Sequence, residues 1–204
     1  MRIKIRGTED RTGGLQIQPI RDILEERGHE TAKDGMEGDL CIHFTRADEK
    51  GYSVAKSGRD VYISWHTRPE AFRALGKALE HAGKEKWRDE NKGTQGNTGL
   101  MFDCSRNGVL KVEAVKEMIR QAALMGLNWL LLYTEDTYEV EGYPCFGALR
   151  GRYTKEEIRE CDAYAAQFGI EMIPCIQTLA HLRTALRWPA MEKYRDDADI
   201  LLAE

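Results

Sequence analysis

The spacing of apolar positions changes near residue 97, and the two halves predict different structures. In the first half, short alternating or apolar runs indicate strands, and apolar residues three and four positions apart indicate helices. The predicted elements are strands at residues 2–6, 39–45, 52–56 and 60–65, and helices at residues 17–27 and 68–82. They predict one sheet with helices on one face, a small α+β domain.

A polar segment separates the two halves. Residues 84–96 (KEKWRDENKGTQG) are almost wholly polar and end in glycine. Such a change of composition is typical of a connection between domains. We therefore predict a small α/β domain at residues 1–90, a linker at residues 91–97 and a second domain at residues 98–204.

Apolar runs alternate with helical patterns in the second half. The runs lie at residues 99–104, 129–133 and 171–176, and the helices at 112–125, 154–168 and, shorter, 178–186. Gly126 and Gly169 follow the longer helices as stop signals, and Thr154 with Glu157 matches a capping box. Residues 198–203 begin a further element.

This order of elements predicts a parallel sheet. Strands joined through helices by short connections must run parallel, and runs that are apolar throughout indicate burial on both faces. A doubly wound sheet and a (β/α)8 barrel both fit, but no GxGxxG or P-loop follows the first run. The predicted fold class is α/β, with the small α+β domain followed by the first three βα units of a TIM-type barrel.

The predicted barrel is incomplete. A closed barrel takes roughly 200 or more residues, and the second half is about half that long. We expect an unpaired sheet edge and exposed apolar faces, which favour self-association.

The composition limits the kinds of molecule that the chain is expected to bind. A net charge of −4 gives no reason to expect nucleic acid or membrane, and the N-terminus has no secretory pattern, which predicts a cytoplasmic protein. The five cysteines are scattered without a CxxC pair, so free thiols are predicted and no metal or cofactor is required. Four histidines lack ligand spacing and are interpreted as structural or surface residues: His29, His43, His66 and His81.

Polar side chains follow all three apolar runs. They are Asp103, Arg106, Tyr133, Glu135, Asp136 and His181. The opposite ends of the runs are plain turns. Because the chemistry of α/β folds lies beyond the carboxyl ends of the strands, this asymmetry indicates an active-site face.

These segments resemble glycoside hydrolase family 20, the β-N-acetylhexosaminidases. MFDCSRNGVLKVEAVKEMI resembles the family's first barrel strand and helix with its D-x-S/A-R motif. LNWLLLYTEDTYEVEGYP resembles the second strand, where many members have H-L-T-D-D, and PCIQTLAHL resembles the third, often P-G-H. Glu135 and Ala180 depart from these motifs, as in a divergent branch.

The resemblance implies roles for single residues. Arg106 would hydrogen-bond the hydroxyls of the non-reducing sugar, and Glu135 with His181 would form a carboxylate–histidine relay behind the catalytic acid. Asp103, Tyr133 and Asp136 would support substrate binding. The implied substrates are glycans that carry N-acetylglucosamine or N-acetylgalactosamine.

The resemblance also implies a mechanism and a missing part. The family uses the substrate's acetamido group as nucleophile, together with an Asp-Glu pair after the fourth strand. The sequence ends at Leu201-Leu202-Ala203-Glu204, before the expected fourth strand, and Glu204 is not preceded by Asp, so the chain is expected to be an inactive N-terminal fragment of the enzyme.

Two other readings fit the sequence. One is a non-catalytic carbohydrate-binding or assembly protein that uses Arg106, Trp129 and Tyr138. The other is a different barrel hydrolase with Glu135 or Glu139 as its acid.

Overall fold

The computed structural model describes residues 1–7, 14–33, 35–93, 96–106 and 108–196. The further element expected at residues 198–203 lies outside the described residues. No helix among the described residues is long and apolar enough to cross a membrane.

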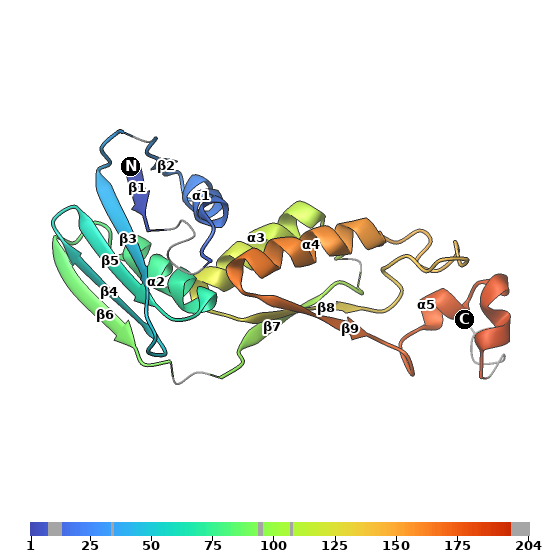
Figure 1. Cartoon of the computed structure of the whole chain (residues 1–204). Coiled ribbons are helices and arrows are strands. Elements are labelled where there is room, and N and C mark those ends of the chain that lie inside the picture. The colour runs from blue at the N-terminus through green and yellow to red at the C-terminus, as the bar shows by residue number, and fades with distance from the viewer. Residues whose placement is uncertain (8–13, 34, 94–95, 107, 197–204) are drawn as a thin grey trace.

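The first half forms a six-stranded sheet in the order β2-β1-β3-β5-β4-β6. Its elements are β1 (Arg2–Arg6), α1 (Ile17–Glu26), β2 (Glu30–Thr31), β3 (Leu40–Arg46), β4 (Tyr52–Ser57), β5 (Asp60–Trp65), α2 (Arg68–Glu80) and β6 (Lys86–Asn91). Strands β2, β1, β3 and β5 run parallel, whereas β4 is antiparallel to both β5 and β6. Both helices lie on one face of this sheet, as predicted (Figure 1).

Strand β6 corrects the interpretation of the polar segment. Residues 86–91 lie in the stretch expected to connect the domains, yet they pair along their whole length with β4. The hydrophobic pattern missed this strand because it is an edge strand whose only large apolar side chain is Trp87. Backbone pairing with β4 holds it in place, together with Trp87, which packs against the core.

The second half forms a parallel sheet in the order β7-β8-β9. Its elements are β7 (Gly99–Asp103), α3 (Val112–Met125), β8 (Trp129–Thr134), α4 (Lys155–Phe168), β9 (Glu171–Ile176), the short α5 (Arg183–Leu186) and a 3₁₀ turn (Pro189–Tyr194). Helices α3 and α4 cover one face of the sheet (Figure 1). This is the βαβαβ order that the apolar runs predicted.

The ends of the helices follow the predicted signals. Gly126 and Gly169 take left-handed φ values of 79° and 76°, which a residue with a Cβ adopts only with strain. At the start of α4, the Glu157 amide donates to Thr154 Oγ1 at 3.1 Å, and the Thr154 amide donates to Glu157 Oε2 at 2.8 Å. The capping box is therefore confirmed.

The expected burial of the second sheet on both faces is wrong for the described residues. Met101 and Ile173 both pair with Leu131 across the sheet, on the face away from the helices, and they are exposed by 58% and 38%. The helices cover one face alone, and no described element packs on the other. The apolar pattern therefore includes a face that stays exposed, as the incomplete barrel predicts.

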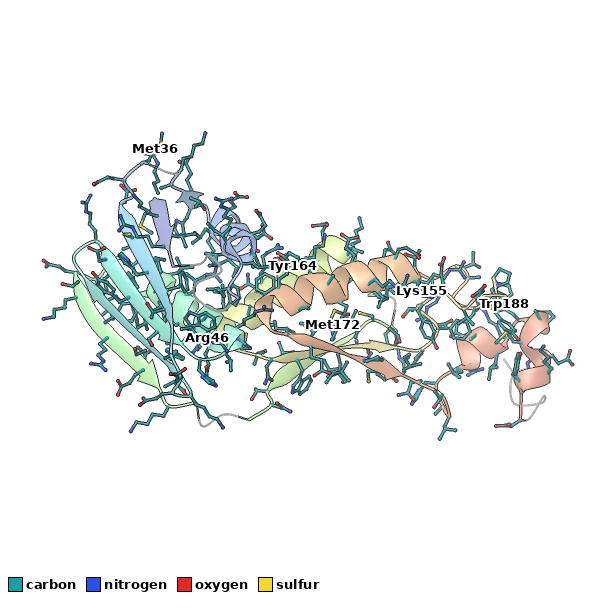
Figure 2. The ribbon with its side chains drawn as sticks, viewed as in Figure 1. Met36, Arg46, Lys155, Tyr164, Met172 and Trp188 are labelled. Carbon is teal, nitrogen blue, oxygen red and sulfur yellow. The ribbon has the colours of Figure 1, made fainter. Side chains whose placement is uncertain are left out.

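One core joins the two halves. Helices α1 and α2 lie between the first sheet and the pair α3 and α4 (Figure 1). The rings of Phe72 and Phe168 meet across this junction with centroids 4.8 Å apart. Tyr164 on α4 donates to Asp22 on α1 at 2.8 Å; Figure 2 labels Tyr164 on α4 and Met172 on β9.

The helix predicted at residues 178–186 is mostly wrong. Only residues 183–186 are helical, and residues 177–182 form a loop after β9. His181 takes a left-handed φ of 59°, which a right-handed helix cannot include. The side chain of His181 is therefore positioned by a loop.

Candidate active site

The carboxyl ends of β7, β8 and β9 lie together at the end of the second sheet that points away from the first sheet (Figure 1). The strand register places Asp103 beside Tyr133, and Tyr133 beside Cys175. Because the strands are parallel and in this register, the segments that follow them must share one end of the sheet.

Glu135 is the centre of this cluster. It directly follows β8 and is only 4% exposed. Arg106 Nη1 donates to Glu135 Oε1, the Tyr133 hydroxyl donates to the same oxygen at 3.4 Å, and His181 Nδ1 lies 3.8 Å from it. Residues from all three strand ends therefore converge on one carboxylate oxygen.

Glu135 and His181 lie close together without a direct hydrogen bond. Their separation of 3.8 Å is an ion-pair distance, and Arg106 Nη2 lies 3.5 Å from His181 Nδ1. Arg106 thus contacts both members of the predicted relay. The side chains of Arg106 and His181 are 57% and 55% exposed, so both are open to a ligand.

Ser105 holds the turn that presents Arg106. Its amide and hydroxyl donate to Asp103 Oδ1 at 2.8 and 2.6 Å, and its oxygen accepts from Arg106 Nη1 at 3.2 Å. Ser105 is fully buried and was missing from the predicted site residues. The sequence feature that could have identified Ser105 is the serine position of the D-x-S/A-R motif.

Hydrogen bonds and charge set the protonation of three groups. The two hydrogen bonds from Ser105 lower the pKa of Asp103. The hydrogen bond and charge of Glu135 raise the pKa of Arg106, while desolvation, followed by the charge of Glu135, raises the pKa of Tyr133. At neutral pH the cluster therefore contains a carboxylate at Asp103, a guanidinium at Arg106 and a neutral phenol at Tyr133.

Asp136 lies apart from the other predicted site residues. It is 1% exposed, and its nearest cation is Arg150, whose Nη1 lies 3.4 Å from Asp136 Oδ1. Among the described residues neither carboxylate oxygen has a hydrogen-bond partner. Its role in substrate binding stays a prediction, and its burial opposes direct contact with a sugar.

No pattern in the sequence identifies Arg150 as the partner of Asp136. It lies in the loop between β8 and α4, in the segment GALRGRY, without a motif or periodic pattern. The structure brings it to Asp136 because the chain returns at Tyr153, whose amide donates to the Thr137 carbonyl at 3.0 Å. The ion pair therefore holds this loop against the end of β8.

An apolar groove lies beside His181. Its lining includes Tyr138, Phe146, Leu179 and Met191. The rings of Tyr138 and Phe146 meet edge to face at 5.2 Å. Aromatic side chains next to polar ones suit a ligand with both apolar and hydroxyl-bearing faces.

In the described part of the chain, Trp129 and Glu139 form no hydrogen bond or ion pair with this cluster. Trp129 begins β8, so the length of the strand separates it from Glu135. Glu139 is partly exposed, 3.8 Å from Arg152. Among the described residues, no group of three metal-ligating side chains gathers at these strand ends.

Sequence comparison covers the part of the chain that carries the cluster. Residues 98–199, half of the chain, match the model of the glycosyl hydrolase family 20 catalytic domain. A β-hexosaminidase of Vibrio furnissii is 34% identical over 126 residues, which cover 50% of this chain and 20% of that protein. The chain thus spans a fifth of this relative's length.

Solved structures share the fold over both halves. A variant of Streptomyces plicatus β-hexosaminidase in complex with N-acetylglucosamine has a TM-score of 0.67 at 20% identity, covering 90% of this chain and 43% of that one. A β-N-acetylhexosaminidase of Streptomyces coelicolor has a TM-score of 0.64 at 21% identity, covering 91% and 44%. The match of the catalytic-domain model to half of the chain shows that this protein belongs to glycosyl hydrolase family 20.

Proposed function

We propose that the chain is the N-terminal part of a β-N-acetylhexosaminidase that removes terminal N-acetylhexosamine residues by substrate-assisted, retaining catalysis. The observation that supports this most is the convergence of Arg106, Tyr133 and His181 on Glu135 Oε1. Family membership and the β-hexosaminidase relative agree with it.

Arg106 is the sugar-binding residue of this proposal. A guanidinium offers donors in a planar fork that matches two neighbouring hydroxyls. One side of the Arg106 fork is held by Glu135 and Ser105, while more than half of the side chain is exposed. The buried carboxylate therefore fixes the cation and leaves part of it open to the substrate.

Glu135 and His181 form the second part of the proposal. A carboxylate next to a histidine stabilises the imidazolium and so tunes the proton affinity of the acid beyond it. In the ligand-free chain Arg106 contacts both residues, so the relay works only when the sugar draws part of the guanidinium away. The acetamido oxygen of the substrate is the proposed nucleophile.

The 204 residues are proposed to be insufficient for hydrolysis. Glu135 is already bound by Arg106, and Asp136 is buried beside Arg150, so neither is placed as a general acid. The catalytic Asp-Glu pair would come from a part of the barrel beyond the described strands. This proposal also disfavours Glu135 as the acid of another hydrolase class.

The alternative of a non-catalytic carbohydrate-binding or assembly protein has less support than the enzyme. It requires Arg106, Trp129 and Tyr138 on one surface, but Trp129 lies at the other end of β8. Sugar binding without hydrolysis by the 204-residue chain is expected under both readings, so hydrolysis in a longer polypeptide decides between them.

The test combines binding with hydrolysis. Titration of the 204-residue chain with N-acetylglucosamine, followed by NMR, should show binding that Arg106→Lys weakens about tenfold, because a charge-assisted hydrogen bond is worth roughly 1.5–3 kcal/mol. Arg159→Lys, on the exposed side of α4, is the matched control. Equal affinity of the wild type and Arg106→Lys would overturn the assignment of Arg106.

Hydrolysis is measured with an aryl N-acetyl-β-D-glucosaminide. We expect turnover by any longer polypeptide that contains this chain with the remaining barrel strands, and none by the 204 residues. An aryl β-D-glucoside, which lacks the acetamido group, should not be cleaved. Turnover of the glucoside at a similar rate would rule out substrate assistance.

A further inference from the structure

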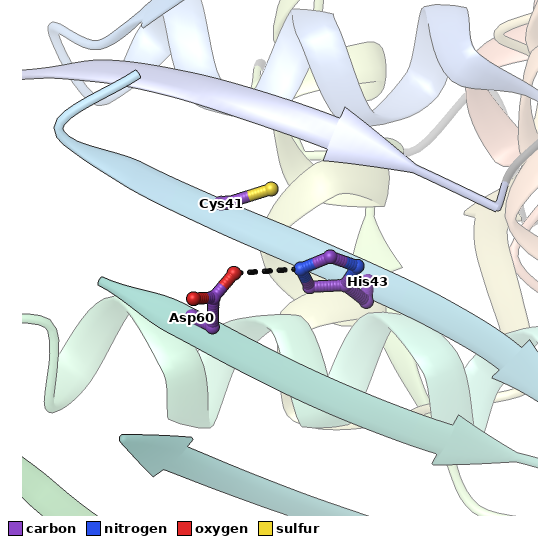
Figure 3. A group of neighbouring side chains, drawn as sticks. All are labelled: Cys41, His43 and Asp60. Carbon is purple, nitrogen blue, oxygen red and sulfur yellow. Dashed lines mark hydrogen bonds and ion pairs between the residues drawn. The ribbon is translucent and has the colours of Figure 1, made fainter. Parts of the chain in front are cut away.

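Three potential metal ligands lie together on the first sheet, far from the candidate active site. Cys41 and His43 come from β3, and Asp60 begins β5 (Figure 3). Along β3, Leu40, Ile42 and Phe44 point into the core, so Cys41 and His43 must point to the opposite face, which the helices do not cover.

The strand register fixes this arrangement. Cys41 is the direct partner of Asp60 in the parallel pair of β3 and β5, and His43 lies two residues farther along β3. His43 Nε2 is 2.8 Å from Asp60 Oδ1, and the three ligand atoms all lie within 4.8 Å of one another. A tetrahedral zinc ion holds its ligand atoms roughly 3.5 Å apart, so side-chain rotations alone could close the site.

The histidine is already oriented. Its ring stacks on that of Tyr62, with centroids 4.8 Å apart and planes 15° apart, while Asp60 holds one ring nitrogen. The side chains of His43 and Asp60 are 23% and 46% exposed. The cluster is therefore partly desolvated, yet an ion can reach it from solvent.

We propose that Cys41, His43 and Asp60 form a binding site for Zn²⁺ with three protein ligands and one position left for water. A thiolate, an imidazole and a carboxylate are the ligand types that zinc takes, whereas calcium and magnesium favour sites built wholly from oxygen. This departs from the sequence-based interpretation of His43, which considered spacing along the chain and not pairing across strands.

Neighbouring charges limit the affinity. Lys4 and Arg6 are the register partners of Cys41 and His43 on β1, and Arg59 precedes Asp60. These cations repel a metal ion, although they also favour the thiolate that binds it. Burial raises the pKa of the Cys41 thiol, so the unliganded cysteine is not an activated nucleophile. The expected site is thus a metal site of moderate affinity.

The test is a Co²⁺ titration of the reduced 204-residue chain, followed by its absorption spectrum and then by Zn²⁺ displacement. We expect one equivalent of Co²⁺ to give a thiolate-to-metal charge-transfer band that Zn²⁺ removes. Cys41→Ser should abolish the band, and His43→Gln and Asp60→Asn should each weaken Zn²⁺ binding at least tenfold. Cys175→Ser, at another partly exposed cysteine, is the matched control and should change neither the charge-transfer band nor the Zn²⁺ affinity.

A second measurement uses the wild type alone, so it still tests the site if a variant fails to fold. In the wild type, Zn²⁺ should slow alkylation of Cys41 at least tenfold, as seen by peptide mass spectrometry, while the rate at Cys175 stays the same. The absence of a charge-transfer band, its persistence in Cys41→Ser, or equal alkylation of Cys41 with and without Zn²⁺ would each overturn the site.

Discussion

At the scale of single residues, the candidate site depends on side chains that hold one another. Glu135 receives Arg106, and Ser105 bonds both Asp103 and Arg106. A buried hydroxyl with two charged partners contributes more than an exposed one, because its loss leaves groups without partners. Ser105 therefore supports both the stability and the shape of the site.

We expect Ser105→Ala to lower the free energy of unfolding by about 1 kcal/mol at neutral pH. The folded-state pKa of Asp103 lies below its unfolded value, so this contribution is present above the unfolded pKa and is lost as the pH falls through the folded one. The difference between variant and wild type should therefore shrink towards about pH 3, as measured by urea unfolding.

The control for this prediction is Ser57→Ala, at the exposed end of β4. Because Asp103 is itself exposed, solvent screening keeps the effect at the low end of its range. A difference that stays constant or grows on acidification would contradict the account.

Asp136 and Arg150 give a second prediction at this scale. Arg150→Met would leave the carboxylate of Asp136 buried without its cation, which costs about 3–5 kcal/mol. Urea unfolding should show this loss, and the double variant Asp136→Leu with Arg150→Met should regain part of it. Arg159→Met, in an exposed pair, is the control; a loss no larger than that of this control would contradict the buried pair.

At the scale of elements, the strands of the second sheet approach each other closely where they begin. Gly99 is paired with Trp129, and a Cβ built on Gly99 would lie 2.2 Å from the Trp129 carbonyl oxygen. The backbone cannot move away without breaking the pairing of β7 with β8. Residue 99 must therefore be glycine, because no space is left for a Cβ.

We expect Gly99→Ala to destabilise the chain by roughly 1–3 kcal/mol, because the added methyl group forces the strands apart. Gly108→Ala is the control, since a Cβ there meets nothing within 4 Å. Equal thermal denaturation curves for the two variants would show that β7 and β8 can separate without cost.

The elements also show what a hydrophobic pattern can predict. Helix α3, with the bounds Val112–Met125, and strand β5, Asp60–Trp65, lie where their patterns placed them. The pattern does not indicate strand β6, which forms through pairing with β4, and it predicts a helix where the structure has the loop that carries His181. Pairing partners and left-handed φ values leave no periodic trace in the sequence.

At the scale of the whole molecule, the chain presents an apolar face without a described cover. Met101 and Ile173 lie on neighbouring parts of the second sheet, and both are exposed. We propose that the 204-residue chain associates with itself through this face, because burying such side chains releases free energy in proportion to their apolar area.

The measurement is sedimentation at several concentrations. Met101→Glu and Ile173→Lys should each shift the chain towards monomer, because a charge on the buried face of an assembly is costly. Met36→Glu, at a methionine of similar exposure outside the second sheet, should leave association unchanged. A wild type that is monomeric throughout, or an equal effect of Met36→Glu, would contradict this role for the face.

The sequence by itself determined the βαβαβ order of the second half and which residues follow each of its strands. These features follow from local periodicity, so they could place Asp103, Arg106, Glu135 and His181 near one end of a parallel sheet. Tertiary structure decided which of these residues touch, that Asp136 turns to Arg150, and that Cys41 meets Asp60 across two strands. Such contacts depend on register and on the return of distant loops, because side chains meet in space according to the pairing of whole elements.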